Sequence, residues 1–161
     1  VAEPGTSEHE LGLSVDINAE SSGASQDAVY EWLDENAYKY GFIKRYPADK
    51  TDITGIDNEP WHYRYVGTPH ARIMEERDLC LEEYIDFLRS YTYDGTRLLY
   101  DADMGVTETL APEEPFTEGT LIYFVPAEEG ETRCRIPADC TYTVSGNNVD
   151  GFIVTAEKTA S

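Results

Sequence analysis

The stretch SEHELGLSVD, residues 7–16, decides the fold of the first part of the chain. Its second half alternates apolar and polar residues, and this period of two predicts a β-strand with one apolar and one polar face. Asp16 lies on the polar face. Gly12 precedes the strand and can adopt a backbone conformation that bends the chain. We therefore expect His9 to fold back beside Asp16.

A second alternating stretch, residues 61–66, follows the segment EPWH at 59–62. His62 lies on this predicted strand and can add a third donor to His9 and Asp16. Catalytic zinc commonly has three protein ligands and an open position for water, whose pKa the metal lowers. Glu59 lies three residues before His62 and can accept the proton of that water as general base. The pattern indicates a catalytic metal site.

Structural roles for these histidines stay open at this stage. A single histidine near a strand is more often part of the packing than a ligand, and both motifs are short. We expect a structural role for His70, near a predicted helix start, and exposed side chains for Glu8 and Glu10.

The remaining pattern predicts an α+β fold. Residues 26–40 read as a helix that Ser25 caps and Gly41 ends, and a helix or helix pair is expected over 69–90. We expect residues 1–93 to form a small antiparallel sheet backed by helices, with the metal on the open face of the sheet. Turn signals and short apolar strands after Tyr93 predict a β-rich accessory extension at 94–161.

Composition limits the function further. The 161 residues carry a formal net charge of −20, which disfavours nucleic acid as a partner and is typical of a solvated acidic surface. No apolar run approaches the roughly 20 residues that span a bilayer, and we recognise no signal peptide. Because the chain opens with Val1, we expect a mature or truncated product.

The cysteines do not form a C-x-x-C pair, so a cysteine zinc site is not expected. Cys134 and Cys140 flank a short loop that contains a proline. They are equally compatible with a disulfide in an oxidising compartment and with two free thiols.

The pattern S-x-H-x-x-G-x-(A/S)-x-D followed by E-x-x-H resembles the VanY/VanX-type zinc D-alanyl-D-alanine peptidases. Further segments occur in the order that the VanY-type carboxypeptidases show, and together the resemblance covers about residues 4–90. These segments are YGFIKRYP at 40–47, TGI at 54–56, EPWHYRYVG at 59–67 and LEEY at 81–84.

The resemblance implies that His9, Asp16 and His62 bind Zn²⁺ and that Glu59 is the general base. The implied reaction is hydrolysis of the terminal D-Ala-D-Ala bond of peptidoglycan stem peptides, in an extracytoplasmic bacterial location. Ser14 stands where the family usually has alanine, a change that we expect to be harmless.

Further side chains match positions that are polar or basic in the family, and they are expected either to bind the substrate or to stabilise the fold. They are Ser7, Arg45, Lys50 and Arg64. The family also has an upstream portion with an arginine that polarises the substrate, and no residue here matches it. We therefore expect the N-terminal part of the same protein as a missing partner.

Two other functions are compatible with the sequence. The same scaffold can serve a D,D-dipeptidase or a peptidoglycan endopeptidase, because loops rather than metal ligands set that choice. A non-catalytic module that binds cell wall or a protein partner is the alternative of a different class, and the retention of Glu59 argues against it.

Overall fold

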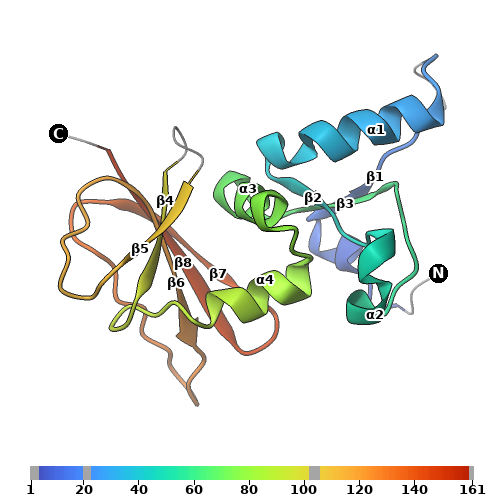
Figure 1. Cartoon of the computed structure of the whole chain (residues 1–161). Coiled ribbons are helices and arrows are strands. Elements are labelled where there is room, and N and C mark those ends of the chain that lie inside the picture. Colours follow the sequence, from blue (N-terminus) through green and yellow to red (C-terminus); the bar gives the residue numbers. More distant parts are fainter. Residues whose placement is uncertain (1–3, 20–22, 102–105, 160–161) are drawn as a thin grey trace. The chain divides into compact units, whose positions relative to one another are not determined.

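The computed structural model describes residues 4–19, 23–101 and 106–159. The backbone divides into two compact units, Val1–Glu82 and Glu83–Ser161, which are described separately below (Figure 1). This division falls within helix α4 (Leu81–Leu88), whereas the sequence pattern predicted a boundary after residue 93.

The N-terminal unit contains a three-stranded antiparallel sheet. Its strands are β1 (Ser14–Asp16), β2 (Phe42–Lys44) and β3 (His62–Tyr65), in the order β1-β3-β2. The central strand β3 pairs Asp16 with His62 across the sheet. The expected small antiparallel sheet of an α+β fold is confirmed, and its register places two of the predicted metal ligands side by side.

The helices of this unit follow the sequence signals with local differences. The helix expected over 26–40 is an α-helix, α1 (Gln26–Asn36), followed by a 3₁₀ turn, η2 (Ala37–Tyr40). Ser25 caps α1 by accepting a hydrogen bond from the backbone N–H of Ala28 at 3.2 Å. Shorter helical segments are η1 (Glu8–Leu11), η3 (Ala48–Lys50) and α2 (Thr51–Thr54).

Gly41 ends η2 because a side chain does not fit there. Its φ is +83°, and an added Cβ would lie 2.8 Å from the ring of Tyr65 and 3.0 Å from the backbone of Gly67. Both the left-handed backbone and the close approach therefore require glycine.

The helical region expected over 69–90 is a pair of helices. The first, α3 (Thr68–Arg77), has Pro69 in its first turn, where the missing N–H costs nothing. It ends at Asp78 with φ of 53°, and α4 follows. The helix begins one residue before the expected start at 69, since Thr68 is its first residue and Gly67 is the N-cap.

The core of the N-terminal unit joins α1 to the sheet. Leu33, Ala37 and Tyr63 are buried together, and Ile17, Val29, Tyr30 and Phe42 pack against them. Since Tyr63 alternates with His62 along β3, the core lies on one face of the sheet and His62 on the other.

The C-terminal unit is a five-stranded antiparallel sheet, in agreement with the expected β-rich extension. Its order is β5-β4-β6-β8-β7. The strands are β4 (Arg97–Asp101), β5 (Val106–Leu110), β6 (Gly119–Pro126), β7 (Thr141–Gly146) and β8 (Gly151–Lys158). Buried Leu121, Tyr123, Val154 and Ala156 form its core.

Cys134 and Cys140 are free thiols in this structure, and both pack against the core of the C-terminal unit. In the part of the chain that the structure describes, no helix has both the length and the apolar character needed to cross a membrane.

Candidate metal centre

The turn η1 brings His9 beside Asp16, as the sequence predicted. The side chain of Ser7 accepts a hydrogen bond from the N–H of His9 at the start of η1. Gly12 ends η1 with φ of 69° and donates its N–H to the carbonyl of His9. The left-handed glycine reverses the chain, and His9 Nε2 lies 3.3 Å from Asp16 Oδ1.

His62 approaches the same carboxylate oxygen from the neighbouring strand. Its Nδ1 lies 3.4 Å from Asp16 Oδ1, as the register of β1 and β3 favours. The rings of His9 and His62 meet edge to face with centroids 4.6 Å apart. The three ligand atoms all lie within 4.8 Å of one another.

These distances fit a zinc ion. Two ligands that each lie about 2.0–2.1 Å from zinc, at a tetrahedral angle, are about 3.3 Å from each other. The separations of 3.3 and 3.4 Å from Asp16 Oδ1 agree with this value. Two imidazoles and one carboxylate are also a donor set that zinc accepts.

The hydrogen-bond partners assign the tautomer of each imidazole. His9 Nδ1 lies 3.2 Å from the carbonyl oxygen of Ser14, which can only accept, so this nitrogen carries the proton and Nε2 has the free lone pair. His62 Nε2 lies 2.9 Å from Oε1 of Glu8, which leaves Nδ1 as the ligand nitrogen. In both rings the free nitrogen is the one that faces Asp16.

Glu59 lies beside this group, in the turn that leads into β3. Its Oε2 is 3.3 Å from His62 Nδ1, and its side chain is 31% exposed. The turn is fixed from both sides, because Glu59 N–H donates to Tyr46 and His62 N–H donates to Glu59. The carboxylate therefore borders the donor set and reaches solvent.

The prediction that Glu8 is exposed was wrong. Its side chain is 13% exposed. Its Oε1 accepts from Ser14 Oγ at 2.6 Å, and its Oε2 accepts from Arg64 Nη1 at 2.8 Å and Arg45 Nε at 3.2 Å. A carboxylate with this many donors is stable in a partly buried position.

The ionised state of Glu8 follows from the same contacts. Burial by itself raises the pKa of the carboxyl, whereas hydrogen bonds from Ser14 and His62 lower the pKa. The positive charges of Arg45 and Arg64 lower the pKa further, to about 2. One sequence signal pointed here: Arg64 shares the predicted strand face of His62, and a buried arginine needs a carboxylate partner.

The side chains proposed to bind substrate contact other parts of the same unit. Arg45 donates to both carboxylate oxygens of Glu82, at 2.6 and 3.0 Å, and Arg64 is buried against Glu8. Lys50 Nζ donates to the carbonyl of Asp78 at 2.9 Å. These contacts favour the fold-stabilising alternative, and a role in substrate binding stays a prediction.

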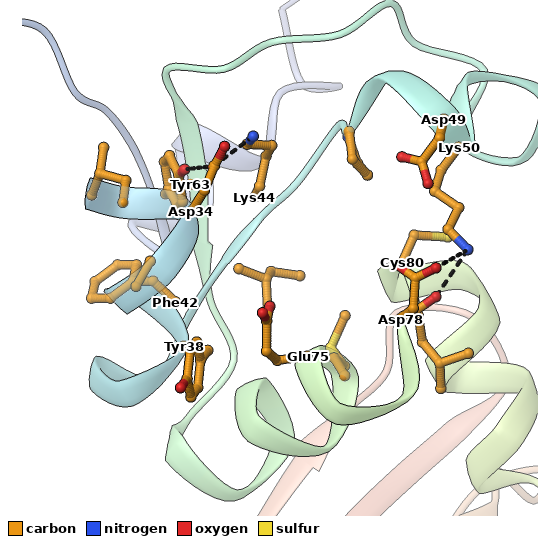
Figure 2. Close-up of a pocket in the computed structure, with 16 residues that line it drawn as sticks. Asp34, Tyr38, Phe42, Lys44, Asp49, Lys50, Tyr63, Glu75, Asp78 and Cys80 are labelled. Carbon is orange, nitrogen blue, oxygen red and sulfur yellow. Dashed lines mark hydrogen bonds and ion pairs between the residues drawn. The ribbon is translucent and has the colours of Figure 1, made fainter. Parts of the chain in front are cut away.

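A separate pocket of about 220 Å³ lies in the N-terminal unit. Figure 2 shows Asp34 between Tyr63 and Lys44: Asp34 accepts from Tyr63 at 2.9 Å and lies 2.5 Å from Lys44 Nζ. Tyr63 and Lys44 are register partners on the sheet face opposite His62. His70 lies outside the donor set, and burial lowers the pKa of its imidazole to about 4, which agrees with a structural role.

Comparison with known proteins gives the family. Residues 1–68 match the family model VanY, described as D-alanyl-D-alanine carboxypeptidase. A D-alanyl-D-alanine carboxypeptidase of Enterococcus faecium is 40% identical over 151 residues, which are 94% of this chain and 44% of that protein. One of Enterococcus faecalis is 62% identical over 86 residues, 53% of this chain and 32% of that protein. The chain therefore spans less than half the length of these relatives.

Comparison with solved structures finds D-Ala-D-Ala peptidases as well. The vancomycin-resistance D,D-dipeptidase VanXYg, in complex with a D-Ala-D-Ala phosphinate analogue, has a TM-score of 0.74 and 37% identity. The alignment covers 98% of this chain and 61% of that chain, so both units have counterparts there. A glutamate-to-alanine mutant of VanY from a VanB-type cassette, in complex with Zn(II), has a TM-score of 0.51 and 62% identity, over 53% of this chain and 48% of that one.

Proposed function

From the membership of this chain in the VanY family, we propose that it carries the zinc-binding core of a hydrolase acting on the terminal D-Ala-D-Ala bond of peptidoglycan stem peptides. The proposed site consists of His9, Asp16 and His62 as ligands, with Glu59 as general base. Because such peptides lie outside the cytoplasm, the proposal includes an extracytoplasmic location.

One observation carries the proposal. Three donor atoms from separate parts of the sequence converge, and each imidazole turns its unprotonated nitrogen toward the shared carboxylate oxygen. Two imidazoles with only packing roles have no reason to present both free lone pairs at one point.

In the proposed reaction, the metal and Glu59 have different roles. When bound, zinc supplies Lewis acidity that polarises a carbonyl and acidifies water. Glu59 accepts a proton from the attacking water and later donates it to the departing amine. The contact of its carboxylate with His62 Nδ1 at 3.3 Å, at the edge of the donor set, supports this role.

A D,D-dipeptidase is the second candidate. VanXYg, named as a D,D-dipeptidase, aligns with both units of this chain, and a bifunctional D-Ala-D-Ala dipeptidase and carboxypeptidase of Enterococcus gallinarum is 42% identical over 96 residues. The two activities share one proposed metal site and differ only in the length of the peptide that they accept.

The test combines metal analysis with product release. We expect the purified chain to bind one zinc ion, to lose it on His62→Ala, and to keep it in the control His70→Gln. D-alanine release from a muramyl pentapeptide is then compared with cleavage of free D-Ala-D-Ala.

Each outcome has a distinct meaning. Preference for the pentapeptide supports the carboxypeptidase, and preference for the dipeptide supports the second candidate. Zinc binding without cleavage of either peptide favours a non-catalytic module. A folded chain that binds no zinc contradicts the proposal.

A further inference from the structure

We propose that Glu8 is a positioning residue that fixes the tautomer and orientation of His62. The inference deepens the proposed function, because it takes His62 as a metal ligand. It assigns Glu8 no contact with substrate and no place among the ligands.

The geometry of the ring carries the first step. Glu8 Oε1 lies 2.9 Å from His62 Nε2, whereas His62 Nδ1 points to Asp16 and Glu59. The contact with Glu8 is the short one and has hydrogen-bond geometry, and an ionised carboxylate only accepts, so Nε2 donates. In the neutral ring the lone pair is then left on Nδ1. A carboxylate that accepts the other N–H of a ligand histidine also raises the basicity of that ligand.

The surroundings of Glu8 make this contact rigid. Arg64 and Arg45 both donate to its second oxygen, Oε2. Arg45 is itself fixed by two hydrogen bonds to Glu82. The carboxylate cannot rotate away from His62 without breaking two charged hydrogen bonds, and these are the strong kind.

The burial of the partners shows why the contact is specific. The side chain of His62 is 7% exposed, and that of Glu8 is 13% exposed, so water does not readily replace either partner. His9 differs: its side chain is 38% exposed, and a backbone carbonyl fixes its tautomer. Only one of the two imidazoles therefore depends on a side chain that mutation can change.

Glu8→Gln is the main test variant because it keeps the shape of the side chain. The amide has its own N–H₂ group and can donate to His62 Nε2, so the ring is free to adopt the Nδ1–H tautomer, which cannot bind metal through Nδ1. We expect zinc binding to weaken by about 10–100-fold, the range typical of lost outer-shell partners. Glu10→Gln, two residues away on the same turn and exposed, is the matched control and should leave zinc affinity unchanged.

The second readout does not involve metal. Long-range ¹H–¹⁵N spectra of the imidazoles in the metal-free chain report the tautomer of each histidine. We expect His62 to be the Nε2–H tautomer in the wild type and in Glu10→Gln, and to gain Nδ1–H in Glu8→Gln. The pattern of His9 should not change.

The outcomes separate this inference from the proposed function. A neutral wild-type His62 that carries its proton on Nδ1 instead of Nε2 overturns the inference before any mutation is made, so the inference stays testable if Glu8→Gln fails to fold. A folded Glu8→Gln chain with unchanged zinc affinity and an unchanged His62 tautomer also overturns it. A wild-type chain that binds no zinc overturns the proposed function, while the tautomer spectra still decide the role of Glu8.

Discussion

Each unit contains a buried arginine, and the two guanidinium groups donate hydrogen bonds to different kinds of acceptor. In the N-terminal unit, Arg64 donates to the carboxylate of Glu8, which in turn contacts His62. In the C-terminal unit, Arg97 donates to the backbone carbonyls of Ala111 and Glu114. The first arrangement links a buried charge to a proposed metal ligand, whereas the second fixes a loop to a strand.

This difference predicts which mutations should change both stability and metal binding, and which should change stability alone. A charge network that ends on a proposed metal ligand is expected to transmit changes to that ligand. A guanidinium bonded to backbone carbonyls changes only the local packing. We therefore expect the C-terminal unit to respond to mutation in stability alone.

The largest expected effect is on catalysis. Glu59→Ala should lower the rate of D-alanine release by about 10²–10⁴-fold, the usual contribution of a general base. Zinc content should not change, because the three proposed ligands remain. Glu76→Ala, an exposed position in α3, is the control for kinetics and metal analysis. Loss of zinc in Glu59→Ala would show that Glu59 is a ligand.

Replacement of the two buried arginines tests the comparison directly. Arg64→Met should lower the free energy of unfolding by about 3 kcal/mol, since breaking a buried ion pair leaves a charge poorly compensated. Arg97→Met should lower it by about 2 kcal/mol, because carbonyl groups lose their partners. Urea unfolding measures both, and zinc competition titration should show weaker binding only for Arg64→Met. Equal weakening by both variants would refute the distinction.

Zinc addition should stabilise the N-terminal unit and leave the stability of the C-terminal unit unchanged. At a free zinc concentration about 100-fold above Kd, binding stabilises the folded state by about 2.7 kcal/mol. Hydrogen exchange with and without zinc should show added protection in peptides from the N-terminal unit and none in β6 and β8. The variant His62→Ala should show no zinc-dependent protection. Equal protection of both units would contradict the localisation of the site.

The smallest expected effect concerns Ser14, which donates to Glu8 at 2.6 Å. Ser14→Ala introduces the residue that the family usually has, and Glu8 keeps its charged partners. We expect a loss of about 0.5–1.5 kcal/mol in the free energy of unfolding, the net value of one hydrogen bond, and little change in zinc affinity. Thermal unfolding and zinc titration of the variant measure both quantities.

The sequence predicted those features that depend on near neighbours. Alternation identified β1 and β3, Gly12 predicted the bend at His9, and the two motifs predicted the three donors that the structure brings together. The start of α1 was predicted correctly, whereas its C-terminal end is four residues earlier than expected and α3 starts one residue earlier. Helix ends depend on backbone geometry that composition does not fix.

The position of Glu8 was missed for a different reason. Its burial depends on Arg45 and Arg64, which are 37 and 56 positions away in the sequence. Glu8 and Glu10, two residues apart, look alike in the sequence. Glu8 accepts from Arg45 and Arg64 in a partly buried position, whereas Glu10 accepts from the N–H of Gly5 at the surface. Only the register of β1 on β3 separates the two.

The shortness of β1 has a thermodynamic consequence. Among the strands that the structure describes, this three-residue strand lies at the edge of the sheet and pairs with β3. His9 and Asp16 both belong to the segment that it anchors. An ion shared with His62 would couple its own binding to the docking of residues 7–16. By reciprocity, docking of the segment strengthens ion binding by the same factor by which the bound ion strengthens docking.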